Sequence, residues 1–158
     1  MGVYQRLRKN LKAAIVYYSK HHGNTKKLLD AIAQEYDVEL IDVSNTKAFN
    51  LSEYQVIGFA SGIYYGNMHK LVLQCAKKNL PLNKKVFFIY TCGNINKKYM
   101  NAIKSIVQEK YAEILGEYEC FGFDTFGPFK LLGGIKKGHP TVEEINRAVE
   151  FYTRIVNE

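Results

Sequence analysis

Two kinds of apolar pattern alternate along the chain from residue 11 onward. Continuous apolar runs rich in β-branched and aromatic residues are typical of buried strands, and apolar residues three or four positions apart are typical of amphipathic helices. The runs predict strands at 11–18, 38–43, 54–60, 85–91 and 113–123, and the spaced patterns predict helices at 25–36, 69–79, 97–111 and 141–156. Because strands alternate with helices, we expect an α/β fold in which a parallel sheet carries helices on both faces.

The length of the chain, 158 residues, fits one domain with a real core. We expect residues 11–158 to form a single domain and residues 1–10 to be an N-terminal extension. The link at 44–53 is short, so it is expected to hold a helical turn rather than a full crossover. Thr141 and Glu144 have the spacing of a capping box, which predicts a sharp start for the last helix.

The charge of the chain is basic, with a formal net charge of +7 and a pI of about 9.2. Most lysines occur in pairs that are spread along the sequence, which favours a generally solvated basic surface over a dedicated polyanion site. An acidic partner protein, a membrane surface and a nucleic acid remain open as partners. Specific binding of nucleic acid is not expected, because no recognition motif accompanies the charge.

The chain is expected to be cytoplasmic. No apolar run approaches the roughly 20 residues that a helix needs to span a bilayer, and the basic N-terminal stretch lacks the apolar region of a secretory signal. Cys75, Cys92 and Cys120 have no CxxC spacing, which argues against a disulfide framework and a zinc site. Each is expected to be a small buried residue.

A phosphate-binding loop is predicted between the first strand and the first helix. Ligands of parallel sheets bind beyond the carboxyl ends of the strands, and the sequence SKHHGNT (19–25) lies at such an end. Its backbone N–H groups and the helix N-terminus favour an anion, and Gly23 permits close approach. Further donors are available on Ser19, His21, His22, Asn24 and Thr25. The alternative is a turn without a ligand, with Asn24 as the N-cap.

Other common sites are excluded by their missing motifs. The chain has no GxxxxGK[ST] phosphate loop, no dinucleotide-binding GxGxxG at the first turn, and no GxSxG or HExxH. A response-regulator receiver needs acidic residues where the first strand ends, and this chain has Tyr18, Ser19 and Lys20 there. We therefore expect no catalytic residues and no metal ligands, so any chemistry must come mainly from a cofactor.

Three loops make the sequence resemble the flavodoxin family. SKHHGNTKK (19–27) is similar to the family's loop for the phosphate of FMN, Ser/Thr-x-Thr-Gly-Asn-Thr before a helix. ASGIYYGNMH (60–69) and TCGNINKKY (91–99) follow the third and fourth strands, where the family covers and holds the flavin ring. The tail at 122–148 resembles a subgroup with Gly-His-Pro before the last helix. This chain has one extra residue in the first loop, and it is basic where well-known flavodoxins are acidic.

The resemblance implies a flavodoxin-like three-layer sandwich with a five-stranded parallel sheet in the order 2-1-3-4-5, and FMN as the cofactor. Tyr64 and Tyr65 are expected to cover the ring, or else to be ordinary surface tyrosines. The stretch 91–94 is expected to offer N–H groups to the ring, or else to be a turn with Asn94 or Asn96 as a helix cap. The cofactor-binding residues implied are Ser19, Lys20, His21, His22, Gly23, Asn24, Thr25, Ser61, Gly62, Ile63, Tyr64, Tyr65, Gly66, Thr91, Cys92, Gly93 and Asn94.

Three functions follow from these observations. The first is an FMN-binding electron-transfer protein that shuttles electrons between redox partner proteins, acidic ones among the candidates. The second is an FMN-dependent oxidoreductase acting on a quinone, protoporphyrinogen or NAD(P)H. The third is a module that binds polyanions, which only the net charge supports. The sequence leaves open whether the chain is a carrier or an enzyme, and whether it forms oligomers.

Overall fold

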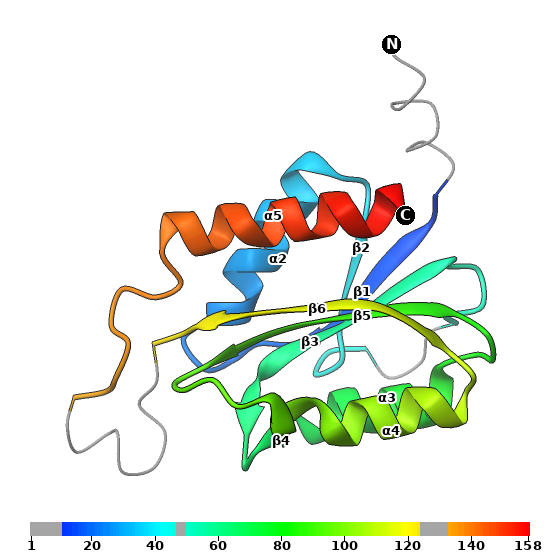
Figure 1. The fold of residues 1–158 in the computed structure, drawn as a ribbon, viewed down its shortest axis with the longest axis horizontal. Helices are drawn as coiled ribbons and strands as arrows, with labels where there is room; N and C mark the ends of the chain where they lie inside the picture. Colours follow the sequence, from blue (N-terminus) through cyan, green and yellow to red (C-terminus); the bar gives the residue numbers. More distant parts are fainter. Residues whose placement is uncertain (1–10, 47–49, 124–132) are drawn as a thin grey trace.

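The computed structural model describes residues 11–46, 50–123 and 133–158. The predicted extension at 1–10 lies outside the described residues. The described residues form the predicted α/β sandwich, with one central sheet between two layers of helices (Figure 1).

Five long parallel strands form the sheet, in the order β2-β1-β3-β5-β6. They are β1 (Ala13–Tyr18), β2 (Glu39–Asp42), β3 (Val56–Tyr64), β5 (Lys85–Cys92) and β6 (Glu113–Phe121). Counted among the long strands alone, this is the predicted order 2-1-3-4-5, and the prediction is confirmed. The first and third loops of the predicted site therefore follow strands that flank β3 in the middle of the sheet.

Helices cover both faces of the sheet, as Figure 1 shows. The helices α2 (Asn24–Glu35) and α5 (Val142–Asn157) pack together on one face. On the other face lie α3 (Lys70–Asn79), the short 3-10 helix η1 (Lys97–Met100) and α4 (Asn101–Glu109). The predicted helix at 97–111 thus begins as a tighter 3-10 turn, with the Asn96 side chain accepting the Lys98 N–H.

The core has two halves because side chains of a strand alternate between the faces of the sheet. In β5, Val86, Phe88 and Tyr90 face the α3 and α4 side, whereas Phe87 and Ile89 face the α2 and α5 side. All five are fully buried, which explains why this strand is an unbroken apolar run.

A short hairpin extends β3 beyond the predicted end of the third strand. Ile63 and Tyr64 pair with β4 (Asn67–Met68), and the two turn residues both have positive φ, 50° at Tyr65 and 78° at Gly66. Turns of this kind suit the twist of a two-stranded hairpin. The sequence prediction of a loop after residue 60 was wrong here, because the pairing of such short strands depends on the sheet that supports them.

Other local predictions are confirmed. Thr141 and Glu144 form the capping box at the start of α5. The three cysteines are buried and free. In the described part of the link at 44–53 the chain forms turns and no crossover helix, and at its start the Asp42 carbonyl accepts the N–H groups of Asn45 and Thr46 at 3.2 and 3.0 Å. Within the described residues, no helix combines the length and the apolar character needed to cross a bilayer.

Candidate functional site

A surface cleft opens where the carboxyl ends of the central strands meet the start of α2. Its lining residues are Ser19, His21, Asn24, Thr25, Gly62, Ile63, Tyr64, Thr91, Cys92, Gly93, Gly122 and Phe123. All three predicted loops contribute, and ten of these twelve residues belong to the predicted cofactor-binding set. Gly122 and Phe123, after β6, were missed, because nothing in their sequence distinguishes them from an ordinary chain turn.

The first loop presents the N-terminus of α2 to this cleft. His22 and Gly23 both have left-handed backbone conformations, with φ of 55° and 63°, and this turns the chain into the helix. The Lys26 N–H donates to the Ser19 hydroxyl at 2.9 Å, and the Lys27 N–H donates to the Gly23 carbonyl at 3.1 Å. The first N–H groups of the helix precede these two and have no partner within the helix, which favours an anion there.

Gly23, and not Asn24, is the N-cap residue of α2, so the alternative of an Asn24-capped turn is wrong. A methyl group added to the Cα of Gly23 would meet no atom within 4 Å. The backbone at Gly23 is therefore open to the approach of a ligand. Its positive φ is the reason for a glycine at this position, because a side chain would be strained.

Asn24 ties the first loop to the segment after β6. Its side-chain N–H donates to the Phe123 carbonyl at 2.8 Å, and the side chain packs so closely on Gly122 that an added Cβ would lie 2.7 Å from the Asn24 amide nitrogen. The Asn24 amide oxygen is buried and has no hydrogen-bond partner in the described structure. This oxygen can accept a hydrogen bond, and a hydroxyl group of a ligand is a suitable donor.

Thr25 and Thr91 join α2 to the end of β5. Their hydroxyl groups share a hydrogen bond of 2.9 Å, and both side chains are buried. Because a hydroxyl can accept as well as donate, the pair keeps acceptor capacity towards the cleft. The bond fixes the spacing between the helix N-terminus and the backbone of the third loop.

Tyr64, which lines the cleft on the β3 side, belongs to an aromatic cluster. The His69 ring stacks on Tyr18 at 3.6 Å between centroids, and its edge-on contact with Tyr64 measures 4.9 Å. His69 also caps α3, because its Nδ1 accepts the Leu71 N–H at 3.2 Å, so the ring proton of the neutral form is on Nε2. Burial and the neighbouring Lys70 lower the pKa of His69, so the ring is neutral at pH 7.

The two predicted ring-covering tyrosines are placed differently. Tyr64 lines the cleft, braced by the cluster just described. Tyr65, at the tip of the hairpin, is 87% exposed and does not line the cleft, and Gly66 lies beside it in the turn. Of the two, Tyr64 is thus the one positioned to contact a flat ring in the cleft.

Some predicted residues support the loops without lining the cleft. Ser61 is fully buried, and its hydroxyl accepts the His69 N–H at 3.0 Å. Asn94 is exposed and accepts the Tyr99 hydroxyl at 3.0 Å. Lys20 and His22 are exposed on the first loop, and the centroids of the His22 and Phe123 rings are 4.4 Å apart. A direct contact of these residues with a cofactor stays a prediction.

Two of the three thiols, those of Cys75 and Cys120, are not activated. The Cys92 thiol donates to the Cys120 carbonyl at 3.7 Å, and the Gly122 N–H donates to the Cys92 carbonyl at 3.0 Å. Burial raises the pKa of the Cys120 thiol and raises that of Cys75 to about 12. Cys75 and Cys120 are therefore protonated at neutral pH and unsuited to nucleophilic attack.

Glu144 holds the segment between β6 and α5 in place. Its carboxylate accepts N–H groups of Thr141 and Phe121, both at 3.0 Å, and it also contacts the Nδ1 atom of His139. Burial raises the pKa of Glu144, but the bonds from Thr141, His139 and Phe121 together outweigh burial and leave the pKa lowered. The ionised carboxylate thus anchors the chain next to Phe123 and the cleft.

Comparison with known proteins agrees with this geometry. Residues 15–126 match the family described as the flavodoxin domain. The chain belongs to the flavodoxin family. An uncharacterized protein of Methanocaldococcus jannaschii is 36% identical over 148 residues, which cover 92% of this chain and 99% of that protein.

Solved structures of flavodoxins share the fold. A flavodoxin from the domain Archaea has a TM-score of 0.61 at 17% identity and covers 92% of this chain and 96% of its own. The two-electron reduced flavodoxin of Megasphaera elsdenii has a TM-score of 0.59 at 20% identity, with 87% and 97% covered. Membership of this family implies a flavin cofactor.

Proposed function

We propose that this protein binds FMN in the cleft and transfers electrons between redox partners. One observation carries the proposal: the open N-terminus of α2 and the braced ring of Tyr64 face the same cleft. The first suits a phosphate and the second suits the flat ring of a flavin, and FMN is a flavin with a single phosphate. When bound, FMN would supply the reversible uptake and release of electrons.

The residues of the cleft divide the binding of FMN between them. The backbone around Gly23, Asn24 and Thr25 would hold the phosphate, with the Ser19 hydroxyl beside it. The buried Asn24 amide oxygen would accept a hydroxyl of the ribityl chain. N–H groups from Thr91 to Gly93 would face the polar edge of the ring and favour negative charge there.

The proposed role is transfer rather than substrate turnover. The Megasphaera elsdenii flavodoxin, whose fold this chain shares, was solved in its two-electron reduced state. Burial raises the pKa of the Cys75 and Cys120 thiols, so these two groups offer no nucleophile. We also propose a cytoplasmic location, since three buried free thiols suit a reducing compartment.

A flavin titration tests this proposal. Protein stripped of flavin should recover the visible flavin absorbance of one FMN per chain, and it should bind riboflavin, which lacks the phosphate, more weakly. Equal affinity for the two would reject the phosphate site, and binding of neither would reject the function. Steady consumption of NAD(P)H or a quinone by the loaded protein alone would favour the oxidoreductase instead.

A further inference from the structure

Exposed lysines surround the cleft. Parallel strands bring loops that are distant in sequence to one edge of the sheet, and the loops at this edge carry Lys20, Lys70, Lys97, Lys98, Lys136 and Lys137. We call these six residues the lysine rim. All six are exposed, and they come from four segments: the loop before α2, the start of α3, the helix η1 and the segment before α5.

Among the residues that the structure describes, the carboxylates at this edge do not neutralise the lysine rim. Asp42 accepts hydrogen bonds from the Ser44 N–H at 2.8 Å and the Ser44 hydroxyl at 2.6 Å. Glu144 is enclosed by its donors, and Glu143 faces Arg147 at 3.7 Å. None of the ion pairs found among the described residues includes a lysine of the rim. The positive charge therefore faces solvent.

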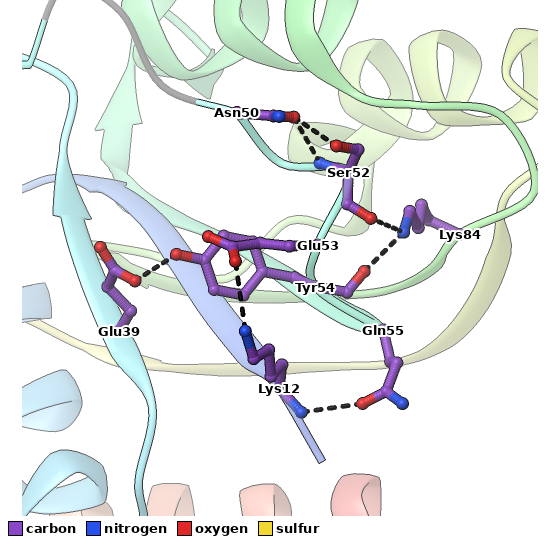
Figure 2. Close-up of polar contacts among 8 residues, drawn as sticks. All are labelled: Lys12, Glu39, Asn50, Ser52, Glu53, Tyr54, Gln55 and Lys84. Atoms are coloured by element: carbon purple, nitrogen blue, oxygen red, sulfur yellow. Dashed lines mark hydrogen bonds and ion pairs between the residues drawn. The ribbon is translucent and has the colours of Figure 1, made fainter. Parts of the chain in front are cut away.

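The opposite edge of the sheet is arranged differently, as Figure 2 shows. There Lys12 pairs with Glu53 at 3.2 Å, and the Lys84 ammonium donates to the carbonyls of Ser52 and Tyr54 at 2.8 and 2.7 Å. The Tyr54 hydroxyl donates to Glu39. Lys12 and Lys84 thus serve the local structure. In the lysine rim, Lys136 has a local contact of another kind, with its ammonium 4.0 Å from the centre of the Phe121 ring, but no rim lysine is paired with a carboxylate in the described ion pairs. The contrast suggests that the rim serves a partner.

Two apolar side chains are exposed inside the lysine rim. Tyr65, at the hairpin tip, is 87% exposed, and Ile95, in the loop before η1, is 49% exposed. The strand β4 of the hairpin contacts η1, so the two residues belong to neighbouring segments. An apolar centre with a charged border is typical of transient protein interfaces. A single exposed apolar residue would need no explanation, but these two flank the cleft.

We propose that an acidic redox protein docks on the lysine rim, with Tyr65 and Ile95 at the centre of the contact. The inference rests on the proposed function, because docking here would place the partner's redox centre next to the flavin. Carboxylates on the partner complement the rim lysines and speed the encounter. The apolar centre would exclude water from the shortest path between the two cofactors.

Two haem proteins of opposite charge provide the probes: cytochrome b5, which is acidic, and cytochrome c, which is basic. Binding to the isotope-labelled protein is followed by amide chemical shifts and by calorimetry at low and at physiological salt. Cytochrome b5 should shift amides around Tyr65, Ile95 and η1, and its affinity should fall steeply with salt. Cytochrome c should bind at least about tenfold more weakly.

A matched pair of variants locates the contact. Lys97→Glu with Lys98→Glu reverses two charges of the lysine rim and should weaken binding of cytochrome b5 about tenfold. Lys77→Glu with Lys78→Glu makes the same change in the last turn of α3, where both residues are exposed, and should change the affinity less than about twofold. Circular dichroism confirms that both variants are folded.

The outcomes separate the inference from the function on which it rests. Binding is measured without added FMN as well, so a chain that binds cytochrome b5 through the lysine rim but not FMN would reject the proposed function alone. Equal binding of both cytochromes, or equal weakening by both pairs of variants, would overturn the inference. So would tighter binding of a single-stranded oligonucleotide than of cytochrome b5, which would identify the lysine rim as a polyanion site.

Discussion

The imidazole of His69 lies flat against the phenol ring of Tyr18, with centroids 3.6 Å apart and planes inclined by 7°. The contact joins the end of β1 to the start of α3, and it places the edge of His69 against Tyr64. One side chain therefore caps a helix, stacks on one tyrosine and braces another. Substitution can separate the cap from the two contacts of the ring.

Replacing His69 by asparagine keeps a good N-cap and removes the ring, whereas alanine removes both. We expect His69→Ala to lower the free energy of unfolding by about 1 kcal/mol more than His69→Asn does. Both variants should bind FMN more weakly, because Tyr64 loses its brace. Urea unfolding and FMN titration check the two effects. Equal stability of the variants would show that the cap contributes nothing.

The lowered pKa of His69 predicts a pH dependence of stability. The unfolded chain, with a histidine pKa of about 6.5, takes up a proton before the folded chain does. The stabilisation is therefore present above pH 6.5 and is lost as the pH falls through the lower folded pKa. Urea unfolding from pH 7.5 to 5 should show this slope, and His69→Asn should flatten it. An unchanged slope would assign it to other groups.

Gly23→Ala should weaken the binding of FMN about tenfold, or about 1.4 kcal/mol, because the methyl group enters the open space at the helix N-terminus. The left-handed conformation should also cost about 1 kcal/mol of stability. Gly138→Ala is the control, since Gly138 has a φ of 82° and open surroundings but precedes α5 and is not at the N-terminus of α2. It should lose similar stability and keep its affinity for FMN. Equal loss of affinity in both variants would contradict a phosphate site at Gly23.

The Thr25–Thr91 hydrogen bond is suited to a double-mutant cycle, because valine replaces threonine with the same shape and no hydroxyl. Each single change leaves a buried hydroxyl without its partner and should cost about 1–2 kcal/mol of unfolding free energy. The double variant should cost less than the sum, with a coupling of about 1 kcal/mol. Additive effects would mean that the bond contributes no stability of its own.

Glu144→Gln should destabilise the protein by about 1–3 kcal/mol, since the carboxylate accepts two backbone N–H groups and contacts His139. Glu143→Gln, on the exposed side of the same turn, should change stability by less than about 0.5 kcal/mol. The folded pKa of Glu144 is lowered, so its stabilisation is present above the unfolded pKa of about 4.3 and disappears as the pH falls through the folded pKa. Acid unfolding of the two variants checks this order.

The sequence predicted the fold and most of the cleft because both depend on local patterns. Apolar runs identified the five parallel strands, and helical spacing identified the helices. The capping box at Thr141 marked the start of α5. The first loop was predicted to lie at the cleft because it joins the carboxyl end of a buried strand to a helix, and its binding of a phosphate stays a prediction. The third loop was found by its place after a buried strand.

What the sequence did not predict depends on contacts between distant segments. Asn24 was interpreted as a possible cap, but its partner is the Phe123 carbonyl, 99 residues away. Gly122 is required because the Asn24 side chain occupies the space of a Cβ, and no local pattern encodes this. In the same way, Tyr64 and Tyr65 are identical neighbours in the sequence, and only the turn at Tyr65 and Gly66 separates their roles.

The hydrogen bond from Asn24 to Phe123 joins a segment that is synthesised early to one that is synthesised late. The complete loop motif at 19–25 leaves the ribosome early, yet the wall that Gly122 and Phe123 give to the cleft arrives only after β6 has been synthesised. A nascent or truncated chain that ends before residue 113 would carry the motif without the finished site. Retention of the cofactor would therefore report that the last strand of the sheet has been added, and a purification that selects bound flavin would select complete molecules.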